Sequence, residues 1–316
     1  MNTQARLSSL PTSIRASGLC LLLCLSAGAC ELTEVTITEI EPNVVVEALA
    51  RIRPEGGGTI IALLHGSVGA PGIDPDGPEA TVRVLADDGA EVLLTEAADE
   101  ACIYGDAPPD PADPRRCYVT TVDPGFVQPS DRLVLQVDLV DGGRIEGGTQ
   151  VPETFEMVQP NGGACAVVAG ALDFVWTQSE GTWYYVTTIE LSGIASDLSA
   201  LGVQNPVDSV VYSSIAVSQS DTAVAYPDDF FLDADEDDFD YTAALNTLVD
   251  DGIQPDWVAS VYVTAADRNL TNWVRGGAFH PSGTVRIPSL RGAGTGFFGS
   301  NVVVGQRIAG DASGCP

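Results

Sequence analysis

Eight acidic residues within thirteen positions form the densest group of side chains that could do chemistry in this sequence: Asp228, Asp229, Asp233, Asp235, Glu236, Asp237, Asp238 and Asp240. The spacing Asp233-x-Asp235-x-Asp237 resembles the start of a calcium-binding loop, whose ligands are hard carboxylate oxygens. Asp238 stands where such a loop has its turn glycine, and Ala244 where it has its bidentate glutamate. Two interpretations follow. The segment is either a weak Ca²⁺ site at Asp233, Asp235 and Asp237, or a solvated acidic loop before a helix.

Cysteines are the second group with definite chemistry, and the body of the chain contains Cys102, Cys117, Cys165 and Cys315. An even number fits disulfide bonds formed in an oxidising compartment. Of the three pairings, we expect Cys102–Cys117 and Cys165–Cys315, since each pair then stays within one predicted domain. A metal site is the alternative, but no C-x-x-C pair occurs and only two histidines could assist, His65 and His280.

Residues 294–299, Gly-Thr-Gly-Phe-Phe-Gly, fit the dinucleotide-binding pattern G-x-G-x-x-G. That site requires a helix at the motif, whose free N–H groups meet the pyrophosphate. Residues 301–304 predict a strand instead, so we expect a glycine-rich bend packed under Phe297 and Phe298.

His65 and Ser67 invite a hydrolase hypothesis, but no G-x-S-x-G motif surrounds the serine. A nucleophile and its base normally come from separate elements, whereas these two residues are almost adjacent. We therefore expect His65 and His280 to lie in loops without a catalytic role.

Aromatic residues are frequent in the second half of the chain, and they could form a stacking platform for a glycan or another flat ligand: Trp176, Trp183, Tyr184, Tyr185, Trp257 and Trp273. Trp183 and Tyr185 alternate with Tyr184, which indicates a strand with one face in the core. Core packing is therefore the favoured interpretation, with the other face partly open.

The charge balance excludes several partners. The chain has 316 residues with 44 acidic and 14 basic side chains, and all the basic residues are arginine. A net charge of −30 repels phosphate backbones and anionic headgroups, which argues against nucleic-acid binding and polybasic membrane docking. Without lysine, Schiff-base chemistry and Walker-type phosphate clamps are excluded as well.

The first 29 residues predict a signal peptide, because Arg6 and Arg15 precede a short apolar run and no acid occurs. Residues 25–30, Leu-Ser-Ala-Gly-Ala-Cys, are similar to a bacterial lipobox, in which the cysteine is acylated and becomes the new N-terminus. We expect lipidation of Cys30 and an acyl anchor in the bilayer. The alternative is an ordinary secretory signal, with Cys30 an incidental thiol.

After a tether over residues 30–42, the pattern changes to period-2 alternation. Turn residues such as Asp87-Asp88-Gly89 and Asp141-Gly142-Gly143 separate the runs. The alternation predicts strands at residues 43–52, 59–65, 80–86, 90–95, 116–122 and 131–140. This spacing indicates an antiparallel β-sandwich of immunoglobulin-like or transthyretin-like type over residues 43–158.

Residues 159–163, Gln-Pro-Asn-Gly-Gly, are expected to link this sandwich to a second domain over residues 164–316. Long alternating strands are predicted there at residues 182–191, 208–218 and 257–265. Two short helices are predicted, one at residues 241–251 and one between the N-cap Asp267 and Gly276. The whole chain is therefore expected to be mostly β, with a β-rich, α+β second domain.

Several short segments follow one another along the chain and are compared together. They are Cys30 with its acidic tether, and residues 42–47, 79–84, 142–144, 149–152, 174–176 and 291–299. Together they resemble a family of uncharacterised bacterial outer-membrane lipoproteins, a domain of unknown function often associated with TonB-dependent uptake systems. The resemblance implies an outer-membrane location, facing the periplasm or the surface, with an outer-membrane transporter as partner. It brings no catalytic residues with it.

Two classes of function remain. The first is a non-enzymatic, membrane-anchored lipoprotein of the cell envelope that binds a protein partner or a ligand without a cofactor. The second is an envelope-anchored hydrolase acting on glycans through paired carboxylates, which leave no sequence motif. The predicted anchor and the lack of a catalytic grouping favour the first.

Overall fold

Strands make up most of the part that the computed structural model describes, which is residues 43–66, 79–102, 115–161, 163–232, 239–275 and 287–315. The predicted leader, Cys30 and residues 233–238 lie outside these ranges. The mostly β fold class predicted from the alternating pattern is confirmed. Within the described residues, no helix is long and apolar enough to cross a membrane.

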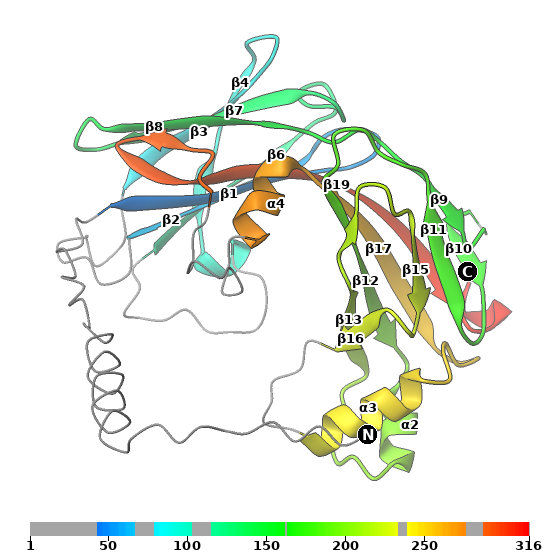
Figure 1. Cartoon of the computed structure of the whole chain (residues 1–316). Helices are drawn as coiled ribbons and strands as arrows, with labels where there is room; N and C mark the ends of the chain where they lie inside the picture. The colour runs from blue at the N-terminus through cyan, green and yellow to red at the C-terminus, as the bar shows by residue number, and fades with distance from the viewer. Residues whose placement is uncertain are drawn as a thin grey trace, which may run out of the picture. The chain divides into compact units, whose positions relative to one another are not determined.

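The largest sheet has eleven strands and takes members from both halves of the chain (Figure 1). Its order is β16 (Phe230–Leu232), β13 (Ser209–Ser214), β12 (Tyr184–Ser192), β17 (Val258–Ala266), β19 (Gly294–Ala309), β1 (Val44–Ile52), β2 (Gly58–Gly66), β6 (Arg115–Val122) and β5 (Thr95–Ala97). Two short strands pair beside this path, β10 (Cys165–Val167) with β19 and β14 (Val217–Ser218) with β12.

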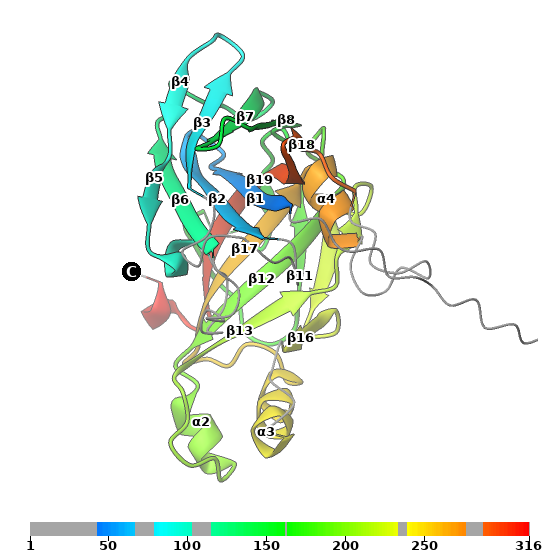
Figure 2. The same cartoon turned by 90° about the vertical axis from the view of Figure 1, so that its left-hand side faces the viewer.

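Two smaller sheets complete the β structure. The five-stranded sheet has the order β18 (Arg291–Gly292), β8 (Arg144–Gln150), β7 (Arg132–Leu139), β3 (Ala80–Ala86) and β4 (Glu91–Leu93). The three-stranded sheet has the order β15 (Ala223–Tyr226), β11 (Leu172–Trp176) and β9 (Met157–Gln159). In Figures 1 and 2, β3, β7 and β8 form a layer beside β1 and β2.

The core lies between these sheets, where alternate residues of each strand are buried. Leu133, Leu135 and Val137 of β7 share one buried cluster with every second residue of β1 and β17. The alternation predicted for β7 is therefore confirmed, and the arrangement of two facing sheets is a sandwich.

Predicted turns and helices are largely as expected. Gly89 and Gly142 adopt positive φ in the hairpins β3–β4 and β7–β8, and the two predicted helices are α3 (Phe239–Val249) and α4 (Arg268–Arg275). A further helix, α2 (Ala195–Ala200), was not predicted, because its six residues show no clear helical periodicity. Two short 3-10 helices are η1 (Asp99–Ala101) and η2 (Ala312–Gly314).

The expected boundary near residues 159–163 does not separate two sheets. β19, near the carboxyl end of the chain, pairs with β1 in parallel and with β17 in antiparallel orientation. Residues 42–316 form one compact unit as a result. Strand pairing across 250 positions leaves no local trace in the sequence, which is why a division at the Pro-Gly linker looked reasonable.

The expected glycine-rich bend at residues 294–299 is wrong, because these residues begin the sixteen-residue strand β19. Gly296 has φ +135°, and a Cβ there would lie 1.9 Å from the carbonyl oxygen of Val46 in β1. The glycine therefore permits a close approach of two backbones, which is the other common reason for glycine inside a strand.

Candidate functional site

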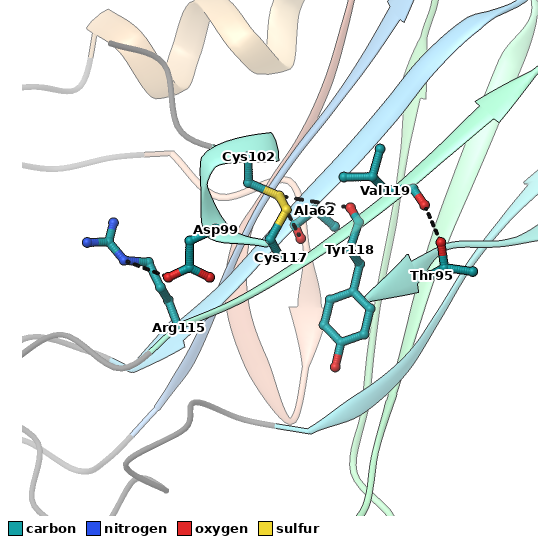
Figure 3. Close-up of a disulfide and its surroundings, with 8 residues drawn as sticks. All are labelled: Ala62, Thr95, Asp99, Cys102, Arg115, Cys117, Tyr118 and Val119. Carbon is teal, nitrogen blue, oxygen red and sulfur yellow. Dashed lines mark hydrogen bonds and ion pairs between the residues drawn. A yellow bond between two sulfur atoms is a disulfide. The ribbon is translucent and has the colours of Figure 1, made fainter. Parts of the chain in front are cut away.

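Both predicted disulfides are present. Cys102 and Cys117 are joined with 5.7 Å between their Cα atoms, and so are Cys165 and Cys315. Figure 3 shows the first bond fixing the end of η1 to β6. Beside it, Arg115 and Asp99 lie 4.0 Å apart in an ion pair, and the hydroxyl of Thr95 donates to the carbonyl of Val119.

Most other predicted site residues lie outside the described ranges. Cys30, the cation candidates Asp233, Asp235 and Asp237, Ser67 and His280 all belong to this group. In the part of the chain that the structure describes, no group of three or more His, Cys, Asp or Glu side chains is placed to hold a metal ion.

His65 lies near the end of β2, which agrees with the strand predicted over residues 59–65 and not with a loop position. Its Nδ1 is 2.9 Å from the carbonyl oxygen of Gly66, and its Nε2 is 3.9 Å from the carboxylate of Glu47. These contacts fix the imidazole within its own sheet.

The aromatic residues divide between core and surface. Trp176, Tyr185 and Trp257 are buried, and the first two rings pack with centroids 5.3 Å apart. Trp273 stacks on Phe297 at 4.8 Å. Trp183 remains 41% exposed. The favoured interpretation, core packing, therefore holds for Trp176, Tyr185 and Trp257, while Trp183 lies on the surface.

The face of the large sheet that points away from this core can be followed strand by strand. Thr188 of β12 lies opposite Tyr262 of β17, and Thr264 lies opposite Val303 of β19. Two residues earlier on β19, Asn301 pairs with Arg51 of β1. Because residues two apart share a face, these side chains all point to one side.

Over β1, β2 and β6 this face is covered by a small hydrophobic cluster of Leu49, Ile61, Cys102 and Cys117. Over β12, β17, β19 and the adjoining ends of β1 and β2 it bears a groove of about 590 Å³, which we call the sheet groove. Its lining includes Arg51, Thr59, Thr188, Tyr262, Thr264 and Asn301. Tyr262 is 42% exposed. Its aromatic ring therefore offers a surface in the same groove as the hydroxyl groups of Thr59, Thr188 and Thr264.

Asn301 is the unusual member of the sheet groove. Its side chain is only 5% exposed, yet its Oδ1 accepts no hydrogen bond from any described residue. A buried amide oxygen without a donor costs about 1–3 kcal/mol. Such a group in a folded protein calls for an explanation.

The polar groups that line the sheet groove are guanidinium, hydroxyl, phenol and amide groups, and its lining includes no Asp, Glu, His or Cys side chain. Sequence patterns had indicated the strands but not this site. The available signal was the set of residues in each alternating strand that face away from the core. In β17 these include Tyr262 and Thr264, which lie between the buried residues Val261, Val263 and Ala265.

No family model matches this chain, and no curated protein matches it. Among solved structures, a DUF4785 family protein from Legionella pneumophila is 9% identical, with a TM-score of 0.23 over 69% of this chain and 51% of that one. The chain thus spans about half the length of that protein. Fibronectin(III)-like modules of Clostridium thermocellum CbhA are 11% identical, with a TM-score of 0.20 over 85% and 94% of the two chains. Similarities this low support no functional assignment.

Proposed function

We propose that the protein is a non-enzymatic lipoprotein of the bacterial cell envelope, anchored through Cys30, that binds a polar ligand in the sheet groove. The observation that carries the binding function is the buried, unpartnered Oδ1 of Asn301 beside the exposed ring of Tyr262. A neutral oligosaccharide suits this lining, because a sugar offers hydroxyl donors to Asn301 and an apolar ring face to the tyrosine.

The anchor is supported by the leader and by the lipobox-like residues before Cys30. Two or more acyl chains would hold the protein at the membrane, since each buried CH₂ contributes about 0.8 kcal/mol. An outer-membrane location, with an uptake transporter as partner, is the matching proposal for its surroundings.

The binding function is tested with Asn301→Leu. Leucine removes an unsatisfied buried acceptor, so the free energy of unfolding should rise by about 1 kcal/mol while affinity for the oligosaccharide falls. Affinity is measured by calorimetry against a panel of neutral oligosaccharides. Val211→Ala is the control, because Val211 is exposed outside the groove. Unchanged affinity in Asn301→Leu, or no binding by the wild type, would reject the proposal.

The anchor is tested separately with Cys30→Ala. This variant should incorporate no labelled fatty acid and should leave the membrane fraction in soluble form. Unchanged membrane retention would contradict lipidation and would leave the groove proposal standing on its own.

One observation favours the hydrolase alternative. A pocket of about 270 Å³ beside α3 is lined by two carboxylates, Asp228 and Asp250, together with Tyr226. Burial raises the pKa of Tyr226, so its phenol stays protonated at neutral pH. Turnover of a glycan panel that is lost in both Asp228→Asn and Asp250→Asn, with folding intact, would establish this second function.

A further inference from the structure

A second cavity lies where α4 begins beside β7 and β8. It has a volume of about 370 Å³, and we call it the junction pocket. Its side chains include Arg132, Gln150, Trp183, Asp267 and Arg268. None of its lining residues belongs to the sheet groove, so the two sites can be altered independently.

Two arginines give the junction pocket its charge. Arg132 and Arg268 are both exposed, and neither forms an ion pair with any residue in the described ranges. Two guanidinium groups that have no carboxylate partner in the described part of the chain stand out, because the net charge of the chain is −30. Guanidinium groups bind carboxylates and phosphates through paired hydrogen bonds, so this lining selects an anion.

Trp183 adds a flat apolar surface to the same pocket. The guanidinium carbon of Arg268 lies 5.1 Å from the centre of the indole ring, within range of a cation–π interaction. The ring nevertheless remains 41% exposed. A ligand that meets both residues therefore combines a negative group with a ring that packs on the indole.

The floor of the junction pocket is held by several hydrogen bonds and carries one buried carboxyl group. Asp267 is 3% exposed, accepts a hydrogen bond from the hydroxyl of Thr149 at 2.5 Å, and caps α4 by accepting from the N–H of Leu270 at 2.9 Å. Asn269 ties α4 to the sheets, since its Nδ2 donates to the carbonyl oxygens of Gly148 and Phe298. A carboxyl group at this position disfavours a ligand group with two negative charges, such as a phosphate, more than a group with one, such as a carboxylate.

We propose that the junction pocket binds a uronic acid residue of an acidic oligosaccharide, with its carboxylate between Arg132 and Arg268 and its pyranose ring against Trp183. The single negative charge fits two guanidinium groups above a buried carboxyl. The pyranose ring of the ligand would pack on the exposed indole of Trp183, which lies beside the two arginines. This site is additional to the neutral-ligand site of the sheet groove.

Calorimetry with digalacturonate as the probe tests the proposal, and the neutral galactose disaccharide is the matched control ligand. The wild type should bind the acidic probe saturably and the neutral one far more weakly. Arg132→Gln and Arg268→Gln should each weaken binding about ten- to a hundredfold, because each removes a hydrogen bond between charged groups. Trp183→Leu should weaken it as well.

Arg291→Gln is the control variant, because Arg291 is an exposed arginine of β18 outside the pocket. It should leave the affinity for digalacturonate unchanged, as should Asn301→Leu in the sheet groove. The proposal is overturned if the acidic probe does not bind, if the neutral probe binds equally well, or if Arg291→Gln loses as much affinity as the pocket variants. Inorganic phosphate that binds more tightly than digalacturonate would overturn it too.

Discussion

At the scale of single residues, the polar groups inside the fold are the most informative. The Oδ1 of Asn301 accepts no hydrogen bond from the described residues, whereas the carboxyl group of Asp267 accepts hydrogen bonds from several donors. Burial raises the pKa of Asp267, and hydrogen bonds from Thr149 and the start of α4 oppose that shift. Local hydrogen bonding thus distinguishes a buried carboxyl group with several donors from a buried amide oxygen with none among the described residues.

Asp267 predicts a definite dependence of stability on pH. A carboxyl group whose pKa is raised by folding favours the native state below its unfolded pKa, and that contribution is lost as pH rises through the native value. Asp267→Asn has no such loss and keeps an N-cap side chain. Denaturant titrations should show the variant gaining stability relative to the wild type as the pH rises above the ordinary Asp pKa of about 3.9.

Asp267→Ala is the companion variant. It removes the cap of α4 and leaves the hydroxyl of Thr149 without its acceptor, so it should lose about 2 kcal/mol of unfolding free energy. A difference between Asp267→Asn and wild type that stays constant with pH would show that Asp267 does not titrate in this way.

At the scale of elements, β19 organises the molecule. It pairs with β1 on one side and β17 on the other, and its Ser300 lies 2.9 Å from the hydroxyl of Thr149 in β8. The sheet groove and the junction pocket lie on opposite faces of β19. Asn301 lines the sheet groove, whereas its neighbour Ser300 contacts Thr149, which lines the junction pocket. The geometry of both sites therefore depends on how closely β19 packs.

Gly296→Ala tests that dependence. A Cβ at this position would overlap the carbonyl oxygen of Val46, and φ of +135° is unfavourable for alanine. The variant should lose about 3 kcal/mol or more of unfolding free energy. Gly125→Ala is the control, since Gly125 has open space around its Cβ position and should change stability by less than about 1 kcal/mol. Equal effects of the two changes would mean that β1 and β19 tolerate a wider spacing.

At the scale of the whole molecule, the shared sheet makes residues 42–316 one structural unit. Strands from the first half cannot complete their hydrogen bonds without β19, and unpaired backbone groups on β1 would be costly to bury. Folding is therefore expected to be cooperative across the linker at residues 159–163.

Calorimetric unfolding should show a single transition whose van't Hoff and calorimetric enthalpies agree. A chain that ends at residue 163 lacks β19, so it should not fold on its own. Two separate transitions, or a folded fragment with native circular dichroism, would restore the two-domain interpretation.

The disulfides should differ in their contribution to stability. Cys102–Cys117 closes a separation of 15 residues, and Cys165–Cys315 closes 150. In the chain-entropy model the shorter loop contributes about 3 kcal/mol and the longer one about 5 kcal/mol. Double alanine variants of each pair, measured by denaturant unfolding, should follow this order, and the reverse order would contradict an entropic origin.

The sequence by itself determined the features that depend on neighbouring residues. Alternation indicated which residues of β7 enter the core, and turn glycines indicated the hairpins. The even number of cysteines predicted disulfides, and the expectation that each pair stays within one half of the chain selected the pairing that the structure has. These follow from local geometry and from simple counting.

Only the tertiary structure decided how distant strands pair. The parallel contact of β1 with β19 placed Arg51 beside Asn301 and removed the expected domain boundary. The junction pocket likewise brings Arg132 and Arg268 together from distant positions. Strand pairing depends on which backbone edges remain free once the core has packed, and no short pattern in the sequence records that outcome.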